Sequence, residues 1–437
     1  MKKILSLALV LVMVLGLAAC GSNGSTASTT AAAATDAAAE TTAAAESEAP
    51  AAASNIKVGF IFLHDENSTY DLNFMNAARQ AIADLGLTED QYLFRTNIPE
   101  GQECYNAAAE LADAGCNIIF ADSFGHEDYI IQAAQEFPDV QFCHATGTKA
   151  HTQGLANHHN AFAAIYQGRY MAGVAAGMKL NQMIEEGKIT ADEAKMGYVG
   201  AYTYAEVVSG YTSFFLGARS VCPSVTMDVT FTGSWYDETA EKEGAEKLIQ
   251  NGCVLISQHA DSMGAPTACE KAGVPNVSYN GSTVSVGPNT YIISSRIDWA
   301  PYYVYAIQAA MDGKTIDADW TGTLATKSVV LSDLNTNVAA DGTQAAIDEA
   351  MKKLENGELH VFDVSTFTVT GENVTADMKT DAEGHLTSYM ADVDNDANME
   401  HDTEVVHDGY FAESEKRSAP YFDIAIDGIV RLDVNFG

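Results

Sequence analysis

Blocks of apolar and polar residues follow one another along residues 56–147 in an order that predicts strands and helices in turn. Short apolar runs rich in β-branched and aromatic residues predict strands: IKVGFIFL, YLFRTNI, CNIIFADSF and VQFCHATG. Between them, apolar residues recur at helical spacing in TYDLNFMNAARQAIADLG, CYNAAAELADAG and HEDYIIQAAQEF. This regular alternation predicts a parallel sheet with helices on both faces.

The alternation starts again after a long helical segment over residues 166–180. The second series predicts strands at KMGYVGAY, TMDVTFTGS, CVLISQHA and VPNVSYN, with helices between them. A later segment, YIISSRIDWAPYYVYAIQAAMDG, predicts a strand, a loop and a helix that carry the chain back between the two halves. We therefore expect an α/β fold of two doubly wound lobes joined by a hinge, with lobe 1 at about 56–165 plus a later segment and lobe 2 at about 190–295.

The pattern weakens beyond about residue 323. KKLENGELHVFDVS predicts a helix followed by a strand, which ends a two-lobed body at about 56–365. Residues 366–437 form an acidic C-terminal extension to which the sequence assigns no role. Its string DVDNDANMEHD lacks the glycine and the distal glutamate of an EF-hand loop, so a solvated acidic loop is favoured over a calcium site. We expect no metal and no cofactor.

The N-terminus has the order of a bacterial lipoprotein signal. Lys2 and Lys3 precede a short apolar stretch that ends in Leu-Ala-Ala-Cys at Cys20. This order predicts a signal peptide over residues 1–20 and lipidation of Cys20, and the alternative is an ordinary secretory signal with an incidental cysteine. Residues 21–55 are almost entirely small or polar and predict a disordered tether. The lipid would anchor the protein on the extracytoplasmic face of the cell membrane.

Composition and charge narrow the class of function. The chain has 437 residues, is 47% hydrophobic and has a formal net charge of −36, which suits a globular body and disfavours binding to nucleic acid. Six cysteines follow Cys20 and have no tight metal-ligand spacing: Cys104, Cys116, Cys143, Cys222, Cys253 and Cys269. Buried free thiols are favoured over disulfides, although disulfides can form in an exported protein.

Aromatic and hydrogen-bonding residues follow the predicted strands at one edge of each sheet. Ligands bind outside the carboxyl ends of the strands in open parallel sheets, so these residues predict a cleft for a flat, polar small molecule. The candidate ligand-binding residues are Tyr70, Ser123, Phe124, Tyr204, Glu206, Trp235, His259, Asp261, Asp298 and Trp299.

Each of these residues also has a structural interpretation. Trp235 and Trp299 line the cleft or lie in the core. Asp261 is a recognition carboxylate, kept ionised by the start of the following helix, or it caps that helix. His259 beside Asp261 permits a catalytic pair, but no nucleophile or metal-binding motif accompanies it, so an enzyme is disfavoured.

Several long motifs, in order over about residues 56–330, resemble the basic membrane protein family of solute-binding lipoproteins. They are KVGFIFLHDENSTYDLNF, IIFADSFGHEDYI, AAIYQGRYMAGVAAGM, MGYVGAYTYAEVVSGYTSFFLGARSV, GSWYDETAEKEGAEKLIQNGCVLISQHADS and IDWAPYY. The resemblance implies a type I periplasmic-binding-protein fold. It also implies an ABC importer component that captures purine nucleosides or bases between two closing lobes and docks on a permease.

Details of the motifs resemble the branch of the family that binds adenine, notably SWYD, QHADS and IDWAPYY. Nucleoside-binding members usually have a lysine near the position of Ser295 and Arg296 in this chain. We therefore expect a monomeric receptor for a purine base or nucleoside, with an adenine-like base ahead. Two other functions stay open: a sugar or autoinducer receptor of the same fold, and a purine nucleoside hydrolase.

Overall fold

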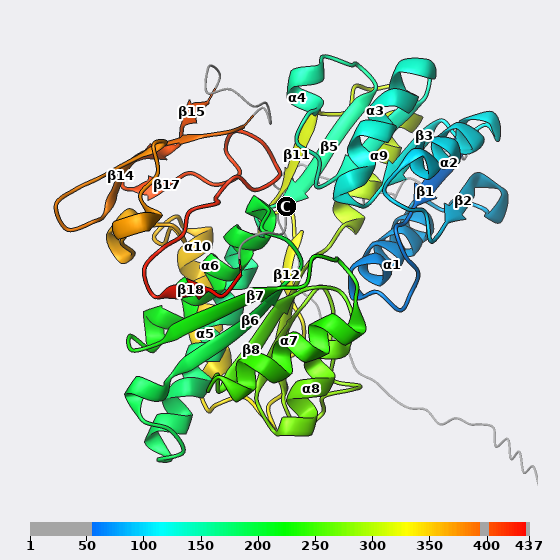
Figure 1. The fold of residues 1–437 in the computed structure, drawn as a ribbon. Coiled ribbons are helices and arrows are strands. Elements are labelled where there is room, and N and C mark those ends of the chain that lie inside the picture. The colour runs from blue at the N-terminus through cyan, green and yellow to red at the C-terminus, as the bar shows by residue number, and fades with distance from the viewer. Residues whose placement is uncertain (1–54, 394–401, 434–437) are drawn as a thin grey trace, which may run out of the picture. The chain divides into compact units, whose positions relative to one another are not determined.

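Lobe 1 is built on a parallel sheet whose strands lie in the order β11-β5-β4-β3-β1-β2 (Figure 1). The computed structural model describes residues 55–393 and 402–433, all within one compact unit, Pro50–Gly437. The strands of lobe 1 are β1 (Val58–Ile61), β2 (Tyr92–Arg95), β3 (Ile118–Ala121), β4 (Gln141–Ala145), β5 (His158–Ala163) and β11 (Asp319–Gly322).

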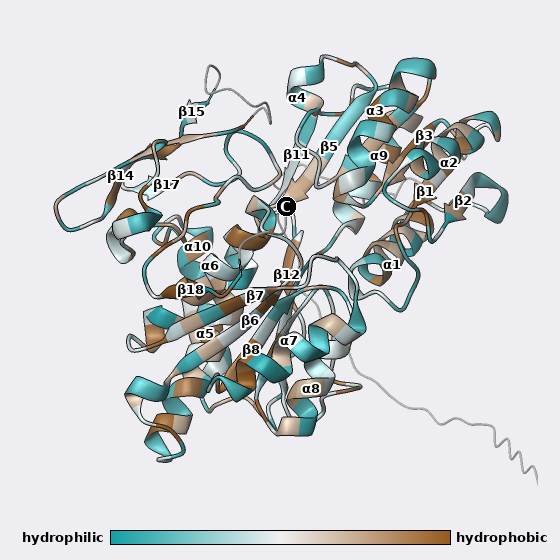
Figure 2. Cartoon of the chain, in the orientation of Figure 1, coloured by the Kyte–Doolittle hydropathy of each residue, from teal (hydrophilic) through white to brown (hydrophobic). Residues whose placement is uncertain are grey.

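Helices cover both faces of this sheet because its strands are apolar on both sides. The helices are α1 (Thr69–Asp84), α2 (Gln102–Asp113), α3 (Glu127–Glu136), α4 (Ala150–Gln153) and α9 (Ala300–Met311). Phe60 and Phe120 pack toward α1 and α9 on one face, and Ile61 and Ile119 pack toward α2 and α3 on the other. In Figure 2 the helices of this lobe carry teal, hydrophilic residues beside brown, hydrophobic ones, and β5 is largely teal.

Lobe 2 has a sheet in the order β12-β10-β9-β8-β6-β7-β18, in which all pairs are parallel except β10 with β12. The strands are β6 (Lys195–Gly200), β7 (Thr226–Phe231), β8 (Leu255–His259), β9 (Asn276–Tyr279), β10 (Tyr291–Ile297), β12 (Val329–Leu331) and β18 (Ile429–Arg431). One face packs against α5 (Ile165–Glu185) and α6 (Ala205–Val221), and the other against α7 (Glu238–Gln250) and α8 (Gly264–Ala272).

Helices α5 and α6 approach each other so closely that their contact depends on glycine. A Cβ atom added to Gly217 would lie 2.0 Å from the carbonyl oxygen of Tyr170, and one added to Gly173 would lie 2.0 Å from that of Phe214. A methyl group therefore has no room at either position.

The chain crosses between the lobes three times. It passes from β5 to α5, returns from β10 to α9, and leaves lobe 1 again between β11 and β12. The expected return through residues 291–313 is therefore confirmed, as is the α/β fold of two parallel-sheet lobes.

The sequence analysis set residues 366–437 apart as an acidic extension. Their described part, 366–393 and 402–433, instead completes lobe 2. Within this segment, β18 adds a parallel strand to the free edge of β7. Helix α10 (Thr343–Glu355), which precedes the segment, packs on α5. The remaining strands are β13 (Met378–Thr380), β14 (Leu386–Ala391), β15 (Thr403–Glu404), β16 (Val406–His407) and β17 (Tyr410–Phe411). Phe367, Tyr389 and Phe422 join the core of lobe 2, an apolar contribution that the acidic composition concealed.

The expected strand after α10 does not form. Its residues Val361 and Phe362 are buried, but the backbone makes only an isolated bridge between Asp363 and Tyr410. Short 3₁₀ turns occupy Glu89–Gln91, Phe124–His126, Ala191–Glu193, Val364–Thr366 and Gly371–Asn373. The acidic string that the sequence analysis interpreted as a solvated loop lies mostly at residues 394–401, outside the described residues.

The segment 413–422 touches both lobes. The hydroxyl of Tyr166, on α5, donates to the carbonyl oxygen of Glu413 at 3.3 Å, and the Ser418 amide donates to the Asp319 carboxylate of β11 at 2.8 Å. The Glu413 carboxyl is buried and accepts from the amides of Tyr421 and Phe422 at 3.2 and 3.0 Å. Burial raises the pKa of Glu413 to about 7 from an ordinary 4.5.

Glu413→Gln should become progressively more stable than the wild type as the pH rises from about 4.5 to 7. Below the pKa that Glu413 has in the unfolded chain, its carboxyl is neutral in both the folded and the unfolded state. Above that pH the carboxyl ionises first in the unfolded chain, so the free energy of unfolding of the wild type falls. A shift of this size corresponds to about 3 kcal/mol, since one pKa unit is about 1.4 kcal/mol. Urea unfolding at pH 4.5 and pH 8 measures the difference. An equal effect at both pH values would contradict it, and Glu372→Gln, at an exposed site, is the matched control.

The six cysteines in the described residues are all free and buried, as expected. Burial raises the pKa of the Cys143 thiol to about 12, so the buried thiol stays protonated. No helix in the described ranges 55–393 and 402–433 is long and apolar enough to cross a membrane. Cys20 and the tether lie outside these ranges.

Candidate functional site

A cavity of ≈ 310 Å³ lies between the two lobes, and residues of both lobes line it. From lobe 1 the lining residues are Leu63, Tyr70, Ser123, Phe124 and Thr146, and from lobe 2 they are Glu206, Trp235, His259 and Asp261. Seven of the ten candidate residues therefore line one site. An eighth, Tyr204, packs beside it, with its ring centroid 5.0 Å from that of Phe124.

The topology explains why these residues meet. Parallel strands present their carboxyl ends at one edge, so residues that follow them gather there. In lobe 1, Ser123 and Phe124 follow β3 and Thr146 follows β4. In lobe 2, His259 is the last residue of β8, and Glu206 lies in the first turn of α6.

Each lobe contributes one aromatic ring to the lining of the cavity. Phe124 comes from lobe 1 and Trp235 from lobe 2. Tyr204 supports both rings, with centroid distances of 5.0 Å to Phe124 and 6.0 Å to Trp235. Tyr202 packs edge-on to Trp235 at 5.0 Å. Rings held in this way present faces to a flat ligand.

Asp261 is fixed on every side by hydrogen bonds. Its amide donates to the carbonyl oxygen of Trp235 at 2.9 Å, and its own carbonyl oxygen accepts from the amide and hydroxyl of Thr69 in lobe 1 at 2.9 and 3.1 Å. Its carboxyl accepts from the Asn280 side chain at 3.1 Å. Asp261 therefore joins the two lobes through its backbone and leaves the other carboxyl oxygen for the cavity.

Asp261 does not cap α8. The amide of Gly264, at the start of that helix, donates to the Ser262 hydroxyl oxygen at 3.0 Å instead. The expectation that helix amides keep Asp261 ionised is also wrong. Burial and the nearby carboxylate of Asp71 raise the pKa of Asp261 well above its ordinary value, so the closed cavity favours the neutral acid.

Glu206 and His259 form the second polar group of lobe 2. The His259 Nε2 atom lies 3.4 Å from the Glu206 carboxylate. Burial lowers the pKa of His259 despite this carboxylate, so the imidazole is neutral near pH 7. Its Nδ1 atom is buried and has no hydrogen-bond partner among the described residues.

The lobe 1 wall is also built from buried polar groups. The Tyr70 hydroxyl donates to the carbonyl oxygen of Asp122 at 2.6 Å, and the Ser123 hydroxyl donates to Glu100 at 2.5 Å. Burial, with Asp71 nearby, raises the pKa of Asp122 well above its ordinary value. These bonds hold Tyr70 and Ser123 in place at the cavity.

Leu63 and Thr146 line the cavity but were not among the predicted site residues. Thr146 has a φ of 67°, which a β-branched residue rarely adopts, and its buried hydroxyl has no partner within the described chain. Unusual backbone of this kind often accompanies binding sites. The position of Thr146 near the end of the segment VQFCHATG, directly after β4, was the signal that could have identified it.

Two predicted site residues lie elsewhere. Trp299 is 1% exposed and stacks on Phe74 with ring centroids 4.4 Å apart, in the core of lobe 1, so the prediction that it lines the cleft is wrong. Asp298 lies in a different, open pocket beside Arg296, and its carboxylate accepts from the Ala300 amide at the start of α9. Both follow β10, whose chain has already turned toward lobe 1 at this point.

The arrangement suits binding of a small molecule. Its two aromatic faces are surrounded by hydroxyl, carboxyl and imidazole groups within an enclosed space. Within residues 55–393 and 402–433, no group of three or more histidine, cysteine or acidic side chains is placed to hold a metal ion.

The model of the Bmp family, described as ABC transporter substrate-binding protein PnrA-like, matches residues 61–361. The chain belongs to this family. It is thus an ABC transporter substrate-binding protein, a class of protein that works outside the cytoplasm in association with the membrane. The match covers both lobes and every residue that lines the cavity.

Curated relatives include a purine-binding protein of Brucella abortus, 32% identical over 316 residues, which cover 71% of this chain and 84% of the relative. A putative ABC transporter glucose-binding protein of Haloferax volcanii is also 32% identical, over 260 residues, which cover 59% of this chain and 62% of that protein. The names of these two relatives give different ligands, a purine and glucose, at the same level of sequence identity.

Solved structures with the same fold include a solute-binding protein of an ABC transporter system from Aeropyrum pernix. It is 17% identical, has a TM-score of 0.59, and the match covers 72% of this chain and 94% of that one. A transcriptional activator of the comK gene from Bacillus halodurans is 18% identical, with a TM-score of 0.57 and coverage of 69% and 99%. These likenesses agree with the two-lobed α/β fold.

Proposed function

We propose that this substrate-binding protein captures a purine, with an adenine-like free base ahead of a nucleoside, in the cavity between its lobes. The observation that carries the proposal is that Phe124 of one lobe and Trp235 of the other both line the cavity. Stacking of a base on an aromatic side chain contributes about 1–3 kcal/mol.

The polar groups around the rings complement the edges of a purine. A free purine has a ring N–H, and adenine also has an exocyclic amino group, while the other ring nitrogens accept hydrogen bonds. Asp261 and Glu206 supply acceptors for the donors. Thr146 supplies a hydroxyl group for a ring nitrogen, and Thr146 and His259 each have a buried polar atom with no partner in the described chain.

Capture would work by closure of the two lobes. Thr69 of lobe 1 bonds to Asp261 of lobe 2, so the cavity wall is complete when the lobes are together. A ligand that contacts both lobes favours the closed form, and that form would then be presented to a permease. Solution scattering should show a smaller radius of gyration with adenine than without it. An unchanged radius for a protein that binds adenine would argue against closure in this chain.

A binding screen of the full chain tests the ligand. Adenine, guanine, adenosine, glucose, galactose and ribose would be compared by thermal shift and then by calorimetry. We expect adenine to give the largest stabilisation. A ligand present at 100 times its Kd adds about 2.7 kcal/mol to the free energy of unfolding. A glucose response without an adenine response would replace it with the sugar receptor, the ligand class of the Haloferax relative. Release of a free base from adenosine would favour the hydrolase.

We also propose that Cys20 is the lipidated N-terminus that anchors the protein at the membrane. The support is the sequence order of two lysines, an apolar stretch and Leu-Ala-Ala-Cys. Mass spectrometry of the membrane fraction should find a lipid on Cys20, and Cys20→Ala should release the protein. A mature N-terminus at any other residue would refute this assignment.

A further inference from the structure

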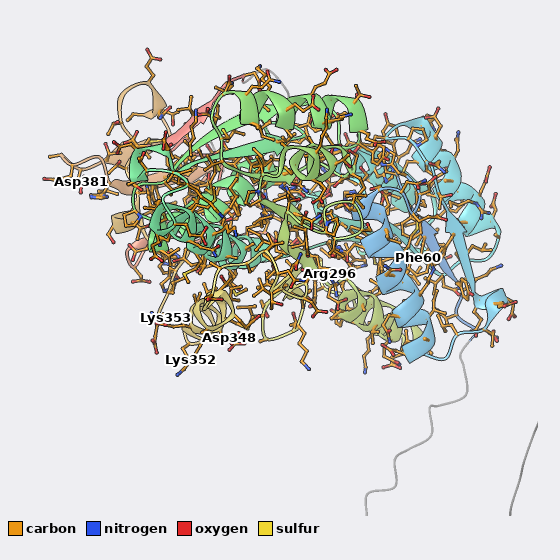
Figure 3. The ribbon with its side chains drawn as sticks, turned by 90° about the horizontal axis from the view of Figure 1, so that it is seen from below. Phe60, Arg296, Asp348, Lys352, Lys353 and Asp381 are labelled. Atoms are coloured by element: carbon orange, nitrogen blue, oxygen red, sulfur yellow. The ribbon has the colours of Figure 1, made fainter. Side chains whose placement is uncertain are left out.

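A second, wider pocket lies directly behind Asp261. It has a volume of ≈ 1050 Å³, and its lining includes Thr69, Asn73, Gln80, Asn280 and Arg296. The labelled Arg296 in Figure 3 lies where the two lobes meet. Carboxamide and guanidinium groups contribute to its walls, and we call it the polar pocket.

One layer of side chains separates this polar pocket from the purine cavity. Thr69 and Asn280 line the polar pocket, and both bond to Asp261, which lines the cavity. Asn280 has a φ of 64°, in the left-handed region. We call these three residues, Thr69, Asp261 and Asn280, the partition.

The partition places a hydrogen-bonding acid at the inner end of the cavity. A free purine base has an N–H at the nitrogen that carries the sugar in a nucleoside, with an acceptor nitrogen, N3, next to it. A carboxyl group accepts from that N–H, and it donates to N3 when it is protonated. In a nucleoside the N–H is replaced by a bulky sugar, which cannot occupy the position of Asp261.

We propose that Asp261, held by Asn280 and Thr69, selects free purine bases over nucleosides by accepting the ring N–H that nucleosides lack. This inference rests on the proposed purine function and identifies the residue that decides between its two ligand classes. A buried group that is built to hydrogen-bond a donor discriminates strongly against a ligand without that donor, because the group is then left unpaired. The sugar of a nucleoside fits only if the partition opens into the polar pocket.

The test compares adenine with 9-methyladenine, which differs by a methyl group at that nitrogen. The wild type should bind adenine at least about 10-fold more tightly. Asp261→Ala should weaken adenine binding by about 5- to 150-fold, the range for leaving a buried donor without its partner, while 9-methyladenine affinity changes less than about 3-fold. The two ligands should thus converge. Calorimetry on the full chain measures both affinities.

A second variant keeps the inference testable if Asp261→Ala does not fold. Asn280→Gly removes the side chain behind Asp261 without backbone strain, since glycine adopts a φ of 64° readily. Asn280→Gly should raise the affinity for adenosine, relative to the affinity for adenine, by about 10-fold, because one steric or polar barrier to the sugar is removed. Gln80→Ala, which lines the polar pocket away from the partition, should leave the ratio unchanged.

Two results would overturn the inference while leaving the purine proposal intact. One is equal wild-type affinity for adenine and 9-methyladenine. The other is loss of both ligands by the same factor in Asp261→Ala, which would mean that Asp261 contacts the amino edge of the base. If the wild type binds no purine, the proposed function fails and the inference fails with it.

Discussion

Replacing Phe124 and Trp235 together by alanine should weaken adenine binding by about 2–6 kcal/mol, or roughly 30-fold and more. Each ring contributes about 1–3 kcal/mol of stacking, and the two lie on opposite lobes around one cavity. The single substitutions should each have about half of the effect. Calorimetry gives the affinities, and the coupling between the two sites shows whether one ligand touches both rings.

A suitable control is Tyr92→Ala, which removes a half-buried aromatic ring from the start of β2, outside the cavity. Its binding should match that of the wild type. Unchanged adenine affinity in the Phe124 and Trp235 double variant, with the fold intact, would place the ligand elsewhere.

Gly217→Val should lower the free energy of unfolding by about 3 kcal/mol or more. The first carbon of any side chain at this position would lie 2.0 Å from the Tyr170 carbonyl oxygen, so α5 and α6 would have to move apart. Both helices pack on the sheet of lobe 2, and α10 packs on α5, so the separation disturbs the core on several sides. Urea unfolding measures the loss.

Ser220→Val is the matched control, because it places the same β-branched residue on α6 at an exposed position. The helix-propensity cost of valine is a few tenths of a kcal/mol up to about 0.7, so this variant should stay close to the wild type. Equal losses in the two variants would mean that a valine anywhere on α6, and not the contact between α5 and α6, explains the effect of Gly217→Val.

Most of the fold was predictable because its strands are short, apolar and separated by helices of regular spacing. Strands such as β1 and β6 are buried on both faces, and their sequences VGFI and KMGYVG show it. The C-terminal part was not predictable. Its contribution to the core comes from scattered residues such as Phe367 and Tyr389 within an acidic segment, and β18 pairs with β7 across about 200 positions of sequence.

The site was predictable where a residue directly follows a strand that ends at the cavity. Phe124, Trp235 and Asp261 obey this rule. The rule failed for Trp299, because β10 is the strand from which the chain leaves lobe 2, and the residues after it enter the core of lobe 1. It also gave no hint that Asp261 would bond to Thr69, since contacts between lobes depend on how the lobes close.

The most direct test of a purine held against Trp235 uses the three tryptophans of the chain. In a Trp299→Phe, Trp320→Phe background, Trp235 is the remaining fluorophore of this type, and adenine is titrated while binding is followed in parallel by calorimetry. We predict a saturable change in fluorescence with one adenine per chain and a midpoint equal to the calorimetric Kd. Calorimetric binding of adenine with no change in the fluorescence of Trp235 would contradict this account.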